Sequence, residues 1–209
     1  MKPICAAAVL FTFFNIPAMA QAPTGSIAVI PVLFQKGSAK AERTGRDVMN
    51  ALLDTAKTTR IPQDQILKAW QDTTGAPWPE KPKGLPTREE MLAVGRAVNS
   101  ELVLETSVKW RDRTVWVSFG PKIKSECTVN CLILNVKTGE TVLEVKDLKM
   151  DDTAREDVFR AVGGAVLSGA FVVPVLSGGD ASPHEQRAVQ LAMGKALMPW
   201  VKARTAAAQ

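Results

Sequence analysis

Few residues in this chain have side chains suited to covalent, redox or metal chemistry, because the 209 residues include only three cysteines and one histidine. Cys127 and Cys131 stand close together, but two thiolates do not complete the tetrahedral shell of a zinc site. The histidine, His184, lies far from them in the sequence. Thiol redox pairs have two intervening residues, whereas this pair has three. The sequence therefore predicts no metal site, no redox centre and no cofactor.

Residues 1–20 have the composition of a cleavable export signal. A positive start is followed by an uncharged apolar stretch at residues 6–16 and by an Ala-Met-Ala cleavage site before Gln21. The apolar stretch is shorter than the roughly 20 residues that a membrane span needs. Cys5 lies at the start of that stretch rather than at the cleavage point, so we expect no lipid anchor. The sequence predicts a periplasmic or secreted protein without a stable membrane anchor, with residues 21–25 as a flexible leader.

An oxidising compartment favours a disulfide between Cys127 and Cys131. Four residues of flat strand span about 13 Å, whereas a disulfide needs Cα atoms within about 7 Å. The bond therefore requires a bend at residues 128–130, and we expect the disulfide with such a bend. The alternative is a pair of thiols on one face of a strand.

Other polar motifs could carry chemistry, but each has a simpler structural interpretation. His184 lies in the first turn of a predicted helix, where an imidazolium is disfavoured, and no nucleophile motif accompanies it. Asp151 and Asp152 are typical of a helix start. Residues 177–180 (Ser-Gly-Gly-Asp) either bind an anion through backbone amides or form a tight loop and cap. We predict no catalytic residue. An exported hydrolase with Asp or Glu chemistry, for example Asp151 near Glu105, is an alternative.

Residues 73–86 form a long loop rich in proline and glycine, and Trp78 stands in it between Pro77 and Pro79. A rigid aromatic side chain in a loop is a suitable anchor for a binding partner. The other interpretation is that Trp78 folds back to cover the core. We predict that Trp78, Pro77 and Pro79 bind a partner. A glycan or small-ligand binder that uses exposed tryptophans is a further alternative.

The composition is that of one folded domain, with 46% apolar residues. The formal net charge is +5, and basic residues alternate with acidic ones instead of clustering. A nucleic-acid interface requires a basic stripe on one face, so we expect no nucleic-acid partner.

The predicted elements alternate between strands and helices and form one domain at residues 26–204. The strands are expected at residues 26–34, near Ile61, and at residues 102–110, 114–119, 128–136 and 141–148. The helices are expected at residues 45–57, 63–71, 87–99 and 153–167 and from residue 183 onward. Turns are expected at residues 111–113 and 137–140, and a flexible tail at residues 205–209. Pro31 weakens the first strand, and Pro199 kinks or ends the last helix. This order predicts an α/β (α+β) fold with a single mixed, largely antiparallel sheet of about five strands packed by helices.

Three segments resemble known proteins: SIAVIPV at residues 26–32, MLAVGRAVNSELVLETSV at residues 91–108 and CLILNVKTGETV at residues 131–142. They are similar to a group of bacterial envelope modules that includes the TolB amino-terminal domain, CsgG and LpoB. That group has a D-x-x-T-G-E turn, and here Asn135 replaces its Asp. The resemblance spans residues 26–167, but this chain lacks the group's common lipid-anchor Cys and has the added proline-rich loop. It implies an α/β module that works by binding other envelope components. We expect a non-enzymatic interaction module with an envelope protein as its partner.

Overall fold

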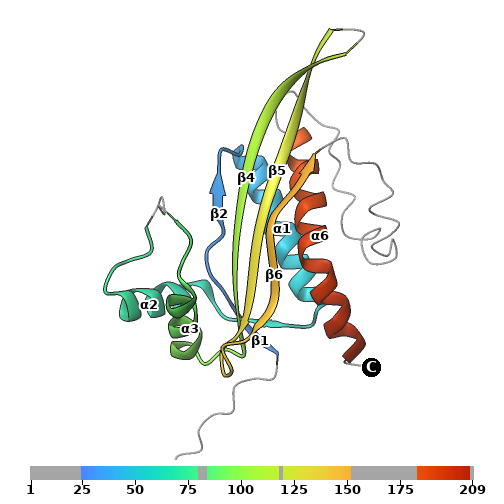
Figure 1. Cartoon of the computed structure of the whole chain (residues 1–209). Coiled ribbons are helices and arrows are strands. Elements are labelled where there is room, and N and C mark those ends of the chain that lie inside the picture. The colour runs from blue at the N-terminus through green and yellow to red at the C-terminus, as the bar shows by residue number, and fades with distance from the viewer. Residues whose placement is uncertain (1–24, 80–83, 118–119, 152–182, 208–209) are drawn as a thin grey trace, which may run out of the picture.

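Six strands form one mixed sheet in this computed structural model, which describes residues 25–79, 84–117, 120–151 and 183–207 (Figure 1). The strand order is β3-β1-β4-β5-β6, and β2 also pairs with β4. The strands are β1 (Ser26–Val29), β2 (Leu33–Gln35), β3 (Thr59–Arg60), β4 (Leu102–Val117), β5 (Gly120–Asn135) and β6 (Thr141–Asp151). The pairings among β1 to β4 are parallel, whereas β4–β5 and β5–β6 are antiparallel. The predicted mixed sheet covered by helices is confirmed.

Helices cover both faces of this sheet (Figure 1). α1 (Ala39–Thr55) and α6 (Pro183–Ala207) pack on one face, and α2 (Gln63–Thr74) and α3 (Arg88–Ala97) pack on the other, beside β1 and the start of β4. Each pair buries its own apolar cluster. β4 contributes Leu104 to the first cluster and Val103 to the second, since successive side chains of a strand point to opposite faces.

Two local motifs fold as the sequence predicts. Thr87 and Glu90 form a capping box at the start of α3, in which each side chain accepts a hydrogen bond from the other residue's backbone amide. In the turn between β5 and β6, Asn135 Oδ1 accepts hydrogen bonds from the amides of Lys137 and Thr138 at 3.0 Å. Gly139 then adopts a φ of 73°, which glycine tolerates without strain.

Replacing Thr87 with alanine should lower the free energy of unfolding by about 1 kcal/mol, because the first turn of α3 loses its cap. Urea denaturation measures this change. Glu89→Ala is the control, since Glu89 lies in the same turn but outside the capping box. An equal loss in both variants would contradict a specific role for the cap.

The structure corrects several predicted boundaries. The turn expected at residues 111–113 does not exist, because β4 runs unbroken to Val117 and pairs with β5 along its whole length. Cross-strand contacts hold this part of the hairpin: Ser125 Oγ donates to Asp112 Oδ1 at 2.7 Å, and Arg113 lies 3.6 Å from Glu126. The turn therefore lies farther along the chain than predicted.

Two further corrections concern proline. The single strand expected at residues 26–34 is divided into β1 and β2 around Pro31, which has no N–H for a sheet ladder. α6 continues through Pro199 as far as Ala207, into the expected tail. Buried neighbours on both sides, such as Leu197 and Val201, hold the two halves of α6 against the core. The predictions for residues 1–24, for the helix at residues 153–167 and for the loop at residues 177–180 lie outside the described residues.

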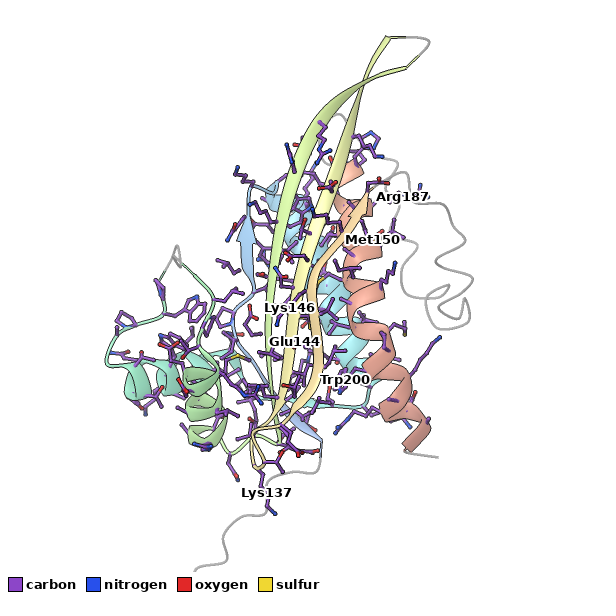
Figure 2. All side chains as sticks on the ribbon, in the orientation of Figure 1. Lys137, Glu144, Lys146, Met150, Arg187 and Trp200 are labelled. Atoms are coloured by element: carbon purple, nitrogen blue, oxygen red, sulfur yellow. The ribbon has the colours of Figure 1, made fainter. Side chains whose placement is uncertain are left out.

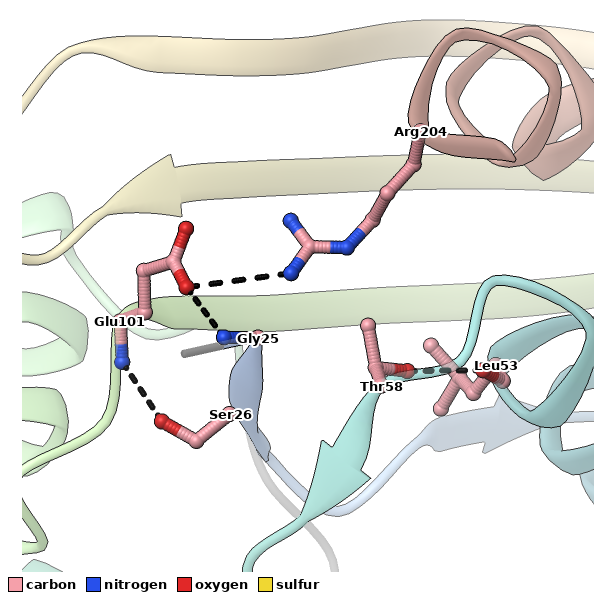
Figure 3. A network of polar contacts seen from close by, with 6 residues as sticks. All are labelled: Gly25, Ser26, Leu53, Thr58, Glu101 and Arg204. Carbon is pink, nitrogen blue, oxygen red and sulfur yellow. Dashed lines mark hydrogen bonds and ion pairs between the residues drawn. The ribbon is translucent and has the colours of Figure 1, made fainter. Parts of the chain in front are cut away.

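Polar contacts tie the start of β1 to the elements beside it (Figure 3). The Gly25 amide donates to Glu101 Oε2 at 2.6 Å, and the same oxygen lies 3.8 Å from the Arg204 guanidinium. The Glu101 amide donates to Ser26 Oγ at 3.0 Å. Arg204 belongs to the last turn of α6, so these contacts fix β1, the entry to β4 and the end of α6 at one end of the sheet.

Candidate functional site

A groove of about 820 Å³ runs beside the edge of the sheet that β1 and β2 form. It is lined by residues 29–32, by Met49 of α1, by Leu67 of α2 and by Trp78, together with the segment that links β3 to α2. Most of these side chains are apolar, and Leu67 is 37% exposed. A mainly apolar concavity of this size with a few polar groups is typical of binding sites.

The backbone along the groove has an open edge. The Ile30 amide donates to the Leu104 carbonyl at 2.9 Å, so the neighbouring Val29 directs its N–H and C=O away from β4. On that outer side the pairing with β3 ends at Ile27, whose carbonyl accepts from the Ile61 amide at 3.0 Å. Within the part of the chain that the structure describes, no strand pairs with residues 29–32 or with β2 on the outer side.

An extra residue lies along this open edge. β1 pairs Val29 with Leu104, and β2 pairs Leu33 with Ser107. The segment between β1 and β2 is therefore one residue longer than the facing segment of β4, as in a β-bulge. Together with Pro31, this irregularity separates β1 from β2.

Trp78, the predicted anchor, lies at this groove and is half-buried, between the exposed Pro77 and Pro79. Its ring packs edge-on against that of Trp70, with 4.7 Å between the ring centroids and an angle of 79° between the planes. Trp70 is buried in the core under α2 and α3. Trp78 therefore packs on the core, as the second interpretation expects, and it also lines the groove. Its binding to a partner stays a prediction.

Two arginines contribute charge to the groove lining. The Arg46 guanidinium lies 5.0 Å from the centroid of the Phe34 ring, and its distance to Glu42 is 3.8 Å, near the limit for an ion pair. Arg60 lies 3.1 Å from Asp54. Arg60 is thus closely neutralised, whereas the half-exposed Arg46 keeps a guanidinium beside the groove.

Glu105 carries a buried carboxyl, and the sequence does not predict this burial. It lies on β4, opposite Leu132 of β5, and is 5% exposed. Its Oε1 atom has no hydrogen-bond partner among the described residues. Burial disfavours the charged form and raises the pKa of Glu105 to about 7. This carboxyl is therefore largely neutral below pH 7.

The structure does not bring Glu105 and Asp151 together, as the hydrolase alternative would require. Asp151 pairs with Glu126 across the β5–β6 ladder, six residues along β5 from Leu132, which is about 20 Å of strand. Its carboxylate lies 2.7 Å from the Lys124 ammonium. The pair of convergent carboxylates that would favour the hydrolase alternative is therefore not found at these two positions.

Cys127 and Cys131 are both free and buried, so the predicted disulfide is corrected. The bend that it required is absent, because β5 stays in register with β4 from Cys127 to Cys131. The local irregularity lies instead in β6, where Asp147 has a φ of 50°. The two thiols occupy one face of a regular strand, under α1 and α6. Burial raises the pKa of both thiols to about 12, so neither forms a thiolate near neutral pH.

Thiol titration should therefore give a different result before and after unfolding. The native chain without residues 1–20 is expected to react slowly or not at all with a thiol reagent. In urea without reductant, two thiols should react per chain. If no thiol reacts in urea, the two cysteines form a disulfide and this prediction is wrong.

The remaining predicted candidates form no chemical site among the described residues. His184 lies in the first turn of α6, as predicted. In the described ranges no three His, Cys, Asp or Glu side chains are grouped so that they could hold a metal ion. No helix in these ranges has the length and apolar character needed to cross a membrane.

Comparison with known proteins gives structural similarity only. No protein-family model matches the chain, and no curated protein matches it. Among solved structures, the LpoB C-terminal domain from Salmonella enterica is similar over 61% of this chain and 81% of that domain, with 22% identity and a TM-score of 0.40. Lipoprotein GNA1162 from Neisseria meningitidis is similar over 69% of this chain and 96% of its own, with 12% identity and a TM-score of 0.44.

Proposed function

We propose that this chain is an exported interaction module of the bacterial cell envelope that binds a protein partner in the groove beside Trp78. The observation that carries the proposal is the groove itself, a concavity of about 820 Å³ that is lined by both apolar and polar side chains and lies next to an open sheet edge. Buried aromatic anchors within such concavities supply much of the affinity in protein interfaces. The export signal predicted at residues 1–20 supports the envelope as the place of binding.

Capture from an envelope extract tests this function. Three proteins are immobilised: the chain without residues 1–20, its Trp78→Ala variant and its Val142→Ala variant as the control. The proteins that each one retains are identified by mass spectrometry. Val142 is 45% exposed on β6, at the opposite edge of the sheet. We expect a protein that the unchanged chain and the control retain and that Trp78→Ala loses. Circular dichroism verifies that all three chains are folded. Retention of the same proteins by all three would contradict the proposal, and recovery of glycan alone would favour the ligand-binding alternative.

A further inference from the structure

We infer that the partner binds as an extended peptide that adds a strand to the sheet along residues 29–35, with alternating apolar side chains and an acidic residue beside Arg46. This inference rests on the proposed function, because it specifies how the same groove is occupied. Its three supports are the direction of the backbone groups, the contrast between the two sheet edges, and the charge of the groove.

The backbone supplies the hydrogen-bonding groups that a new strand needs. Val29 directs its N–H and C=O outward, and β2 has β4 as its neighbour on one side only among the described strands. Alternate residues of an edge strand present both backbone groups to that free side. An extended peptide that lies there satisfies these groups through main-chain hydrogen bonds, and its alternate side chains point to the two sides of the sheet.

The opposite edge of the sheet, formed by β6, lacks these properties. Its pairing with β5 is interrupted twice, and at the first interruption the Asp147 amide donates to Asn130 Oδ1 at 2.7 Å. β6 also carries exposed charges, including the Glu144–Lys146 ion pair at 2.7 Å (Figure 2). Bulges and charges are the usual means by which proteins prevent pairing at an edge. The edge at residues 29–35 also contains an extra residue and Pro31, but it carries no charged side chain and lies beside the groove.

The side chains of the groove specify the chemistry of the peptide. Met49, Leu67 and Trp78 lie on its walls and favour apolar side chains at alternate peptide positions. The Arg46 guanidinium stacks over the Phe34 ring of β2 and remains half-exposed. A carboxylate at the peptide position beside Phe34 would form a charge-assisted pair with Arg46. The partner segment is therefore apolar and alternating, with one acidic residue.

Selection from a phage-displayed library of random dodecapeptides, with the chain without residues 1–20 as the immobilised target, tests this inference. The enriched peptides should have apolar residues at alternate positions and should carry Asp or Glu. Val32→Lys places an ammonium group at the open edge, and Arg46→Glu reverses the charge of the groove. Each change should raise the Kd of an enriched peptide about tenfold or more. Val142→Lys places the same ammonium group on β6 and should leave the Kd unchanged.

Amide hydrogen exchange distinguishes strand addition from other ways of filling the groove. A bound strand should slow exchange of the outward amides within residues 29–35 about tenfold or more. Arg46→Glu alters an exposed side chain, so it remains informative if Val32→Lys unfolds the domain. A library that yields no binding peptide, or peptides whose binding neither slows exchange nor responds to Arg46→Glu, would overturn strand addition. Binding that Trp78→Ala abolishes without slowed exchange would overturn it while sustaining the groove as the partner site.

Discussion

At pH 8, the Glu105→Gln variant is expected to be more stable than the unchanged protein by about 3 kcal/mol. Burial raises the pKa of Glu105 from its ordinary value of 4.5 to about 7 in the folded protein. Between these values the folded state holds a proton that the unfolded state has released, so stability falls as the pH rises. The contribution of the neutral carboxyl is complete below pH 4.5 and is lost as the pH passes 7. Glutamine has no charge to desolvate and therefore lacks this dependence.

Urea denaturation at pH 4, 6 and 8 measures the effect. The free energies of unfolding of the two proteins should be similar at pH 4 and should diverge steadily toward pH 8. Glu144→Gln is the matched control, because Glu144 is 46% exposed on β6. That variant should show no comparable gain at high pH. A difference between Glu105→Gln and the unchanged protein that stays constant across this range would show that Glu105 is not a neutral buried group.

Replacing Trp110 with alanine should lower the free energy of unfolding by about 4 kcal/mol. Trp110 is 1% exposed, and its ring stacks on Phe34 of β2 with 5.8 Å between the centroids. Its indole Nε1–H donates to the Glu185 carbonyl at 3.2 Å in the first turn of α6. A Cβ atom on Gly37 would collide with the ring, so the chain after β2 also packs closely on it. The indole therefore joins β4, β2 and α6.

Trp110→Phe separates packing from hydrogen bonding in this contact. Phenylalanine retains most of the apolar volume but removes the indole N–H that donates to the Glu185 carbonyl, so we expect a smaller loss of about 1–2 kcal/mol. Denaturation followed by circular dichroism measures both variants, and the loss should be reversible on refolding. A loss below about 1.5 kcal/mol for Trp110→Ala would mean that the surrounding side chains collapse into the cavity.

Motifs that depend on neighbouring residues were predictable from the sequence. The Thr87 capping box and the turn after Asn135 involve side chains within three residues of one another. The turn predicted at residues 111–113 is wrong, because three consecutive charged residues do not end a β-strand when it stays paired with its neighbour. In the structure, residues 112 and 113 lie beyond the ends of β2 and β6, and residues 111–113 are exposed.

The groove and the burial of Glu105 could not be predicted, because both depend on which strands become neighbours. Pro31 indicated a weak strand, but the open edge also requires that β3 stop pairing at Ile27. Trp78 was predicted as a binding residue from its prolines, and the structure adds its contact with Trp70. Glu105 carries no signal of its own in the sequence, since an acidic residue in a strand ordinarily faces solvent.

The two interruptions in β6 have a consequence for stoichiometry. A sheet with two open edges can pair with further copies on both sides, which permits indefinite growth into fibres. In this protein the interruptions and the exposed charges of β6 disfavour pairing at that edge, which leaves residues 29–35 as the edge where we propose that a strand adds among the described strands. We therefore expect one bound peptide per chain.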